Sequence, residues 1–303
     1  MSVLRSGFVG LAGRPNVGKS TLVNAIVGAK VAITSDRPQT TRRAARGIAT
    51  DPEAGWQMVL VDLPGVQRPR DRLTQRMQRR VEQELADSDA ALLVVNAEQG
   101  VGPGDRFIGK ALLRAQERGG PRTPVLCAVN KVDRLRAPET AAVLAEAAEL
   151  ESVDEVFPIS ARTGEGLDAL VSHLGDLLPE GPPLYGPGET TDRPSEVHLA
   201  ELVREQVLRR TREEVPHAVE VFITDVSERE DGLREVHAQI WAESESQKAI
   251  LIGKGGRMVR EIGTAARKEL EQELGAQVFL DLEVRVRERW RRDDGLLDRL
   301  GIE

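Results

Sequence analysis

The sequence is poor in cysteine, histidine and aromatic residues. Its 303 residues include one cysteine, Cys127, which excludes an internal disulfide framework and indicates a reducing compartment. Cys127 lies in an apolar run, which favours burial over catalysis. The four histidines show no metal-ligand spacing with one another or with Cys127, which argues against a His/Cys metal centre. At 3% aromatic residues, the cores are expected to consist mainly of Val, Leu, Ile and Ala.

Long apolar runs are also missing. No run approaches the roughly 18 residues needed to cross a membrane, and no signal peptide precedes the first predicted strand, so we expect a cytoplasmic protein. The length predicts roughly two domains, and 40% hydrophobic with 30% charged residues is typical of packed cores. The net charge of −7 argues against a nucleic-acid partner, but this average can hide two halves of opposite charge.

A phosphate-loop motif lies near the start of the chain. Residues 13–20 match the pattern G-x-x-x-x-G-K-[ST] at every fixed position, between a predicted strand at 8–12 and a predicted helix at 21–27. In this setting backbone N–H groups and the positive end of the helix surround a phosphate. We expect Lys19 to reach the β- and γ-phosphates and the Ser20 hydroxyl to bind Mg²⁺. The predicted phosphate-binding residues are Gly13, Arg14, Pro15, Asn16, Val17, Gly18, Lys19, Ser20 and Thr21.

Short apolar runs recur along the first half, with helical stretches between them. After residues 8–12 they occupy 58–61, 90–95, 125–129 and 156–159. Nearly continuous runs of this length, rich in β-branched residues, predict strands buried on both faces of a mainly parallel sheet. In such sheets the ligand lies beyond the carboxyl ends of the strands, so the residues that follow each run matter most.

Polar residues suited to a nucleotide follow three of these runs. Asp62 suits an indirect Mg²⁺ contact, and the Gly65 N–H can meet a γ-phosphate. Asp133, in Asn-Lys-Val-Asp, can accept both the N1–H and N2–H₂ donors of guanine, which adenine does not offer. A backbone N–H of Ser160-Ala161 can hold the guanine O6. The guanine-nucleotide residues predicted outside the phosphate loop are Asp62, Gly65, Asn130, Lys131, Asp133, Ser160 and Ala161.

This set of motifs resembles the translation-factor class of GTPases. The resemblance implies GTP hydrolysis, Mg²⁺ and two switch loops that respond to the γ-phosphate. We expect the first switch between residues 29 and 49 and the second at 67–80. Thr41 is preferred over Thr40 as a Mg²⁺ ligand, by analogy with the Thr-Arg pair of relatives, and a solvated turn is the alternative for Thr40. The expected metal ligands are Ser20, Thr41 and Asp62.

Two positions bear on the rate of hydrolysis. Val66 stands where small GTPases place the glutamine that orients the attacking water, so another group must position the water or turnover is very slow. Asn16 either helps to hold K⁺ against the phosphates, as in the subfamily that the chain resembles, or is an ordinary polar loop residue. Faster hydrolysis in K⁺ than in Na⁺ would support the first interpretation. The expected catalytic residues are Lys19, Thr41 and Asn16.

A stretch rich in proline and glycine separates the two halves. Residues 179–196 contain five prolines and three glycines, which interrupt helices and central strands. We therefore predict a P-loop α/β GTP-binding domain at 1–178, a linker at 179–196 and a smaller α+β domain at 197–303. The order predicted for the smaller domain is helix, strand, strand, helix, G-x-x-G, helix, strand.

The G-x-x-G segment, residues 253–256, resembles the loop of a type II KH domain. That loop clamps the backbone of about four single-stranded nucleotides. Residues 248–292 hold eleven Lys or Arg against seven Asp or Glu, a net charge of +4 within a chain of −7. A charged helix pair joined by a glycine turn is the alternative. The expected RNA-binding residues are Lys248, Ile252, Gly253, Lys254, Gly255, Gly256 and Arg257.

The two halves together resemble the Era family of bacterial GTPases over residues 5–302. The likeness rests on the motifs at 13–20, 38–42, 130–133 and 247–256. It implies a role in assembling the small ribosomal subunit, with the KH domain on the 3′ end of its ribosomal RNA, and loose contact with the inner membrane. One departure is the acidic segment Ala-Glu-Ser-Glu at 242–245, where relatives often carry a basic residue, and this weakens the local positive field.

Other functions remain to be separated from this one. The main alternative is an RNA-binding chaperone that holds GTP with negligible turnover, as Val66 would permit. A related GTPase of tRNA modification or large-subunit assembly is disfavoured by the single nucleotide domain and the G-x-x-G segment. We expect a monomer with GTP or GDP, the small-subunit ribosomal RNA and the small ribosomal subunit as its partners.

Overall fold

The structure is a computed structural model that describes residues 4–37, 39–66, 69–116 and 122–302. Pro38 of the 38–42 motif and residues 67–68 of the predicted second switch lie outside the described residues. The chain forms two compact units. Unit 1 comprises Met1–Ala32, Thr41–Arg70 and Thr74–Asp192, and unit 2 comprises Ile33–Thr40, Asp71–Leu73 and Arg193–Glu303.

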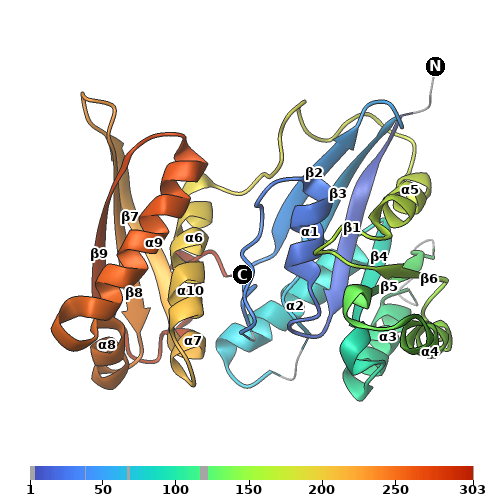
Figure 1. Cartoon of the computed structure of the whole chain (residues 1–303), viewed down its shortest axis with the longest axis horizontal. Helices are drawn as coiled ribbons and strands as arrows, with labels where there is room; N and C mark the ends of the chain where they lie inside the picture. The colour runs from blue at the N-terminus through green and yellow to red at the C-terminus, as the bar shows by residue number, and fades with distance from the viewer. Residues whose placement is uncertain (1–3, 38, 67–68, 117–121, 303) are drawn as a thin grey trace. The chain divides into compact units, whose positions relative to one another are not determined.

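Unit 1 is built on a six-stranded sheet with the strand order β2-β3-β1-β4-β5-β6 (Figure 1). Every neighbouring pair is parallel except β2 and β3. Its strands are β1 (Arg5–Gly13), β2 (Ala45–Asp51), β3 (Trp56–Asp62), β4 (Ala90–Asn96), β5 (Val125–Asn130) and β6 (Glu155–Ile159). Its helices are α1 (Lys19–Val27), most of α2 (Arg72–Ala86), η1 (Ala97–Gln99), α3 (Pro103–Gln116), η2 (Val132–Arg134), α4 (Ala137–Ala148) and α5 (Leu167–Leu177).

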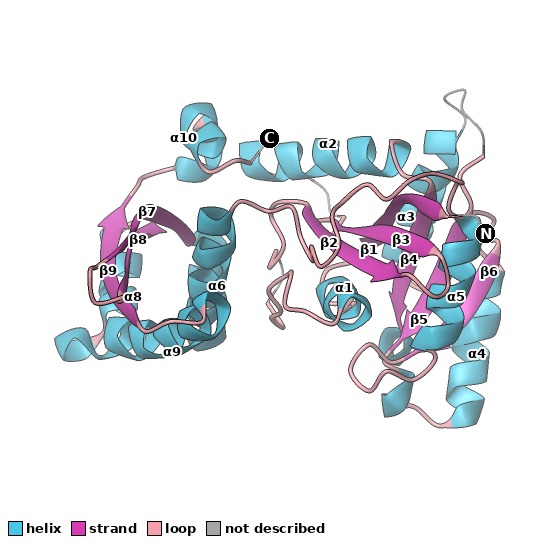
Figure 2. Ribbon diagram, turned by 90° about the horizontal axis from the view of Figure 1, so that it is seen from above, coloured by secondary structure: helices cyan, strands magenta, loops and turns pink. Residues whose placement is uncertain are grey.

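Both faces of this sheet are covered by helices, as the continuous apolar runs predicted. Along β4, Ala90, Leu92 and Val94 belong to the apolar cluster with residues of α1 and α5. The alternate residues Ala91, Leu93 and Val95 belong to the cluster with residues of α2, α3 and α4. Figure 2 shows α2 and α3 on one side of the sheet and α1 on the other. A strand with apolar neighbours on both faces needs no polar alternation.

The 179–196 segment belongs to unit 1 as far as Asp192. Glu180 forms an isolated bridge with Arg5, and Thr191 forms one with Gly47. Gln57, 1% exposed, accepts the N–H groups of Leu184 and Tyr185 at 2.7 and 2.9 Å. Its amide donates in return to the Tyr185 carbonyl at 3.1 Å. The proline-rich segment is thus tied to β3 before α6 begins.

Unit 2 contains a three-stranded sheet with the order β7-β8-β9. β7 and β8 are antiparallel, whereas β8 and β9 are parallel. The elements are α6 (Ser195–Arg210), α7 (Val215–Ala218), β7 (Glu220–Glu228), β8 (Arg234–Ala242), α8 (Glu245–Ile252), η3 (Lys254–Gly256), α9 (Arg257–Leu274), β9 (Val278–Val286), η4 (Trp290–Arg292) and α10 (Asp294–Arg299). The order predicted from the sequence is present, with α7, η4 and α10 added.

The apolar core of unit 2 lies between the sheet and the helices α6 and α9. Leu202 and Val203 of α6, Ile262 and Ala266 of α9, and Ile240 of β8 are all buried in one cluster. The outer face of β9 is different, because its alternate residues are polar or exposed. Such alternation is typical of a strand with one face on the core and the other in solvent.

Candidate GTP and RNA sites

The phosphate loop joins the end of β1 to the start of α1. Gly18 is the N-cap of α1 with φ 105°, in a region of backbone conformation that glycine favours. A Cβ at Gly18 would lie 2.3 Å from Nδ2 of Asn130, so the loop approaches β5 more closely than any other residue would allow. The same Asn130 amide donates to the Val17 carbonyl at 2.9 Å. Thus a residue that the sequence placed in the guanine site also fixes the loop.

Lys19 is buried inside the loop that it belongs to. The residue is 6% exposed, and its ammonium group donates to the carbonyls of Gly13 and Arg14, each at 3.1 Å. Burial lowers the pKa of Lys19 to about 8, partly opposed by the negative charge of Asp62. The amine is thus directed into the loop, where a phosphate would supply the missing negative charge.

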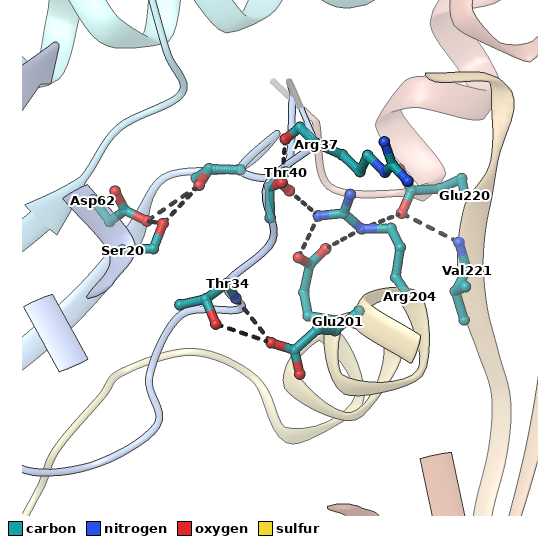
Figure 3. A network of polar contacts seen from close by, with 11 residues as sticks. Ser20, Thr34, Arg37, Thr40, Asp62, Glu201, Arg204, Glu220 and Val221 are labelled. Atoms are coloured by element: carbon teal, nitrogen blue, oxygen red, sulfur yellow. Dashed lines mark hydrogen bonds and ion pairs between the residues drawn. The ribbon is translucent and has the colours of Figure 1, made fainter. Parts of the chain in front are cut away.

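Three oxygen-bearing side chains meet at the predicted Mg²⁺ site. The Ser20 hydroxyl donates to Oδ2 of Asp62 at 2.6 Å (Figure 3). The Thr41 hydroxyl lies 3.2 Å from the same oxygen and 3.1 Å from Ser20 Oγ. Two hydroxyls and a carboxylate are hard oxygen donors, which fit Mg²⁺. The neighbouring Thr40 points elsewhere, because its hydroxyl donates to the Arg37 carbonyl at 2.6 Å.

The predicted base-recognising carboxylate is held by two donors. The Ser160 hydroxyl donates to Oδ1 of Asp133 at 2.7 Å, and Arg162 donates to Oδ2 at 2.6 Å. These bonds, that of Ser160 first, hold the pKa of Asp133 below its usual range. Of the Ser160-Ala161 pair, from which one backbone N–H was expected to meet guanine O6, Ala161 donates its N–H to Oδ1 of Asn130 at 2.9 Å.

Lys131 connects the base motif to the phosphate loop. Its backbone is left-handed, with φ 73°, and its ammonium group donates to the Asn16 carbonyl at 2.9 Å. Asn16 is itself exposed and left-handed, with φ 64°. The end of β5 and the phosphate loop are therefore joined by the bonds from both Asn130 and Lys131.

The structure shows a contact that the sequence did not reveal. The side chain of Arg14 forms an ion pair with Asp105 at 2.9 Å and donates to the Gly100 carbonyl at 3.2 Å. Asp105 is fully buried and also accepts the Gly102 N–H at 2.9 Å. Arg14 was predicted among the phosphate-binding residues, and its side chain anchors the loop to the start of α3. No sequence spacing relates position 14 to position 105, so this pair could not have been found in advance.

Val66 packs into the apolar core. Its side chain is 9% exposed and belongs to the same cluster as Leu63 and Val81. Its N–H lies 3.3 Å from the Gly13 carbonyl. The Val66 side chain cannot form a hydrogen bond, and its burial also keeps it away from solvent. It therefore cannot position the attacking water molecule.

The G-x-x-G segment forms a tight, exposed turn between α8 and α9. Gly253 ends α8 with φ 71°, and a Cβ there would lie 2.8 Å from Cβ of Met258. A Cβ at Gly255 or Gly256 would meet nothing within 4 Å. Lys254 and Arg257 are exposed on either side of these glycines. The turn thus presents open backbone flanked by positive charge, as a phosphate-binding loop requires.

The acidic segment before α8 has structural partners. Glu243 forms an ion pair with Arg291 at 2.5 Å. The Ser244 hydroxyl caps α8 by accepting the Gln247 N–H, and Glu245 lies in the first helical turn, where a negative charge is favourable. The acidic side chains that weaken the positive field therefore also stabilise the elements that carry the glycine turn.

Comparisons with known proteins decide the family. A model described as 50S ribosome-binding GTPase matches residues 8–131, and a KH domain model matches residues 214–291. GTPase Era of Mycobacterium sp. (strain KMS) is 48% identical over 305 residues, covering 100% of both chains. GTPase Era of Mycobacterium tuberculosis (strain ATCC 25177 / H37Ra) is 47% identical over the same span. The chain belongs to the Era family of GTPases.

Solved structures agree with this assignment. A variant of Aquifex aeolicus Era bound to GDP·AlF₄⁻ matches with a TM-score of 0.93 and 34% identity, over 99% of both chains. Era in complex with MgGDPNP and nucleotides 1506–1542 of 16S ribosomal RNA matches with the same values. The predicted family and fold class are confirmed: a P-loop GTPase domain followed by a KH domain. Within the described residues, no helix is both long and apolar enough to span a membrane.

Proposed function

We propose that this GTPase is an assembly factor of the small ribosomal subunit. In this proposal unit 1 binds and hydrolyses GTP with Mg²⁺, and the KH domain in unit 2 binds the 3′ end of the small-subunit ribosomal RNA. The observation that carries it is the full-length likeness to Era solved with MgGDPNP and nucleotides 1506–1542 of 16S ribosomal RNA. The likeness covers both domains at once, whereas the matches to single domains do not join GTP to RNA.

The nucleotide part assigns a role to each element of the loop site. Lys19 neutralises the β- and γ-phosphates. Asp133 recognises guanine by accepting its N1–H and N2–H₂ donors. Ser20 and Thr41, with Asp62, hold Mg²⁺, which balances charge on the triphosphate. The support is geometric: the three oxygens lie within 3.2 Å of one another, and Asp133 is already oriented by Ser160.

The RNA part rests on the open glycine turn. Gly255 and Gly256 leave space for a nucleic-acid backbone, and Lys254 and Arg257 supply positive charge beside it. Lys248, Ile252 and Gly253 complete the proposed surface. Glycine loops of this kind hold single strands by contacts to phosphates, which fits an unpaired RNA end.

A binding experiment tests the RNA assignment. A labelled RNA with the 3′-terminal sequence of the organism's own 16S ribosomal RNA is titrated with the full chain, Mg²⁺ and a non-hydrolysable GTP analogue. We expect it to bind at least about tenfold more tightly than a shuffled RNA, a difference of roughly 1.4 kcal/mol. A large-subunit RNA fragment provides a further comparison. Equal affinity for all three RNAs would refute the small-subunit assignment.

A second candidate function is a chaperone that holds GTP and barely hydrolyses it. The buried side chain of Val66 favours it. Single-turnover hydrolysis separates the two functions, because small GTPases without a partner reach about 10⁻⁴ s⁻¹. A rate below roughly 10⁻⁵ s⁻¹ that RNA does not change would favour the chaperone.

The same assay tests the K⁺ interpretation of Asn16. If Asn16 helps to hold K⁺ against the phosphates, hydrolysis is faster in K⁺ than in Na⁺, and Asn16→Ala abolishes the difference. Equal rates in the two salts would leave Asn16 as a polar loop residue. The proposal places the protein in the cytoplasm as a monomer, with the loose membrane contact that the family resemblance implies. Cell fractionation and light scattering test these points.

A further inference from the structure

Part of the predicted first switch belongs to unit 2. Unit 1 breaks off at Ala32 and resumes at Thr41, and residues 33–40 between them group with the KH domain. Thr41 lies in unit 1, where its hydroxyl meets Ser20 and Asp62. The peptide bond from Thr40 to Thr41 is therefore the point where the switch passes from one unit to the other.

Contacts at both ends of the segment hold it on unit 2. Ile33 is 3% exposed and belongs to the apolar core cluster of this unit. The Thr34 N–H donates to Oε1 of Glu205 at 2.9 Å, and the Thr34 hydroxyl lies 3.3 Å from the same oxygen. At the far end, the guanidinium group of Arg204 donates to the Thr40 carbonyl (Figure 3). The acceptor Glu205 and the donor Arg204 are consecutive residues of α6.

Arg204 is fixed in direction by buried carboxylates. Its Nε and Nη2 donate to Glu201 at 3.2 and 2.5 Å, and Glu220 lies 3.6 Å away. All three side chains are at most 5% exposed. Burial opposes the charge of Arg204, but the carboxylates outweigh it and raise the pKa of the guanidinium group. A planar, always charged group held in this way has one orientation, unlike a flexible ammonium group.

We propose that Arg204 is a positioning residue for GTP hydrolysis. By holding the Thr40 carbonyl on α6, it sets the place of the Thr41 hydroxyl, which is the next residue along the chain. The inference rests on the function proposed above, in which Thr41 is a Mg²⁺ ligand of the triphosphate state. Because Thr41 serves that state alone, loss of the Arg204 contact should affect GTP and not GDP.

The first test is Arg204→Lys. Lysine keeps a positive charge among the buried carboxylates but cannot donate to Glu201 and to Thr40 in the same planar geometry. We expect hydrolysis to slow by roughly tenfold or more, as for other displaced catalytic groups, and affinity for a GTP analogue to fall. The affinity for GDP and for RNA should stay within about twofold, because the phosphate loop and the glycine turn are unchanged.

A second variant changes the segment and leaves α6 intact. Ile33→Ala removes the apolar anchor without altering the buried charges, so it gives an answer even if Arg204→Lys does not fold. We expect the same loss of GTP hydrolysis and of affinity for a GTP analogue. In the double variant the loss should be smaller than the product of the two single losses, because both substitutions release the same segment. Arg210→Lys is the matched control. Arg210 lies on the same helix and donates to Gln206 at 2.9 Å, not to Glu205, and its exchange should leave hydrolysis unchanged.

The outcomes separate this inference from the proposed function. A wild-type chain that neither binds nor hydrolyses GTP refutes both. If the wild-type chain binds and hydrolyses GTP, and Arg204→Lys and Ile33→Ala hydrolyse it at the wild-type rate, only the positioning role is refuted. Lower thermal stability and RNA affinity at an unchanged hydrolysis rate would also refute it, since they indicate a purely structural role in unit 2. Slower hydrolysis with GDP and RNA affinity intact supports it.

Discussion

The two glycine loops of this molecule suit phosphates in opposite ways. The phosphate loop of unit 1 is closed: Lys19 is buried within it, Asn130 fastens it to β5, and a Cβ at Gly18 has no room. The G-x-x-G turn of unit 2 is open, because a Cβ at Gly255 or Gly256 would meet nothing within 4 Å. Glycine thus allows a close internal fit in the first loop and leaves a bare outer surface in the second.

The difference matches the ligands proposed for the two loops. A nucleotide is small and always presents the same phosphates, so a rigid, buried cradle can match it atom by atom. An RNA strand must lie across the protein surface, and its phosphates need free approach and positive charge more than a fixed cavity. Substitutions in the closed loop should therefore affect nucleotide binding, and those in the open loop RNA binding.

The largest effect is expected at the base pocket, which only the closed site has. Asp133→Asn removes the carboxylate that accepts two guanine donors, although Ser160 remains beside it. GTP affinity should fall by about 10³-fold or more, and xanthosine triphosphate should become the preferred ligand. Competition between the two nucleotides measures the change. An unaltered preference for GTP would mean that another group recognises the base.

The same substitution in each loop gives the most direct contrast. At Gly18 an added methyl group would lie 2.3 Å from Asn130 Nδ2, so Gly18→Ala should weaken nucleotide binding by at least about 100-fold, or roughly 2.8 kcal/mol. At Gly255 the methyl group has space and only the positive φ opposes it. Gly255→Ala should therefore change RNA affinity by less than about fivefold. Isothermal titration of both variants with both ligands checks this, and similar losses at the two positions would contradict it.

Negative charge in the open loop should weaken RNA binding more than added bulk alone. Exchange of both Gly255 and Gly256 for Asp places two carboxylates where phosphates approach, beside Lys254 and Arg257. RNA affinity should fall by about 100-fold with the affinity for GTP unchanged. The alanine pair at the same positions is the control for size. If both ligands were lost together, the fold rather than the surface would have changed.

How far the sequence foretold the two loops depends on whether their parts are local. Both glycine motifs and the strands followed from short patterns. The pair of Arg14 and Asp105 did not, because it joins segments that no spacing relates. The first helix predicted for the smaller domain corresponds to α6, but a helix normally keeps its charged face in water. Here residues 198–208 are all buried.

The pH dependence of nucleotide binding is a smaller effect. Burial lowers the pKa of Lys19 to about 8, and bound phosphates raise it again. Below pH 8 Lys19 is charged and binds directly; above it, binding must take up a proton, so affinity should fall by up to about tenfold per pH unit. For folding the sign is opposite. Between about pH 8 and the ordinary value of 10.5 the unfolded chain holds more protons, so rising pH stabilises the unliganded fold through this group.

Titration in buffers of different ionisation enthalpy measures this proton uptake directly. We expect almost none at pH 7 and close to one proton at pH 9. The KH domain serves as the internal control, since its proposed RNA surface includes Arg257, whose hydrogen bond with Glu261 raises its pKa, and its RNA affinity should stay level over the same range. The same pH dependence for both ligands would point to a general effect on charge and not to Lys19.

The smallest effect is expected from the acidic segment beside the open loop. Glu243→Gln breaks the ion pair with Arg291, whose side chain is 28% exposed, so we expect a loss of about 0.5–1 kcal/mol and about 2–4 °C in melting temperature. Glu245→Gln removes the same charge from an exposed position in the first turn of α8. Both should raise RNA affinity by no more than about threefold, since a single charge in contact with solvent is screened. If Glu243→Gln strengthened RNA binding without lowering stability, the acidic segment 242–245 would serve to lower the affinity for RNA and would not be needed for stability.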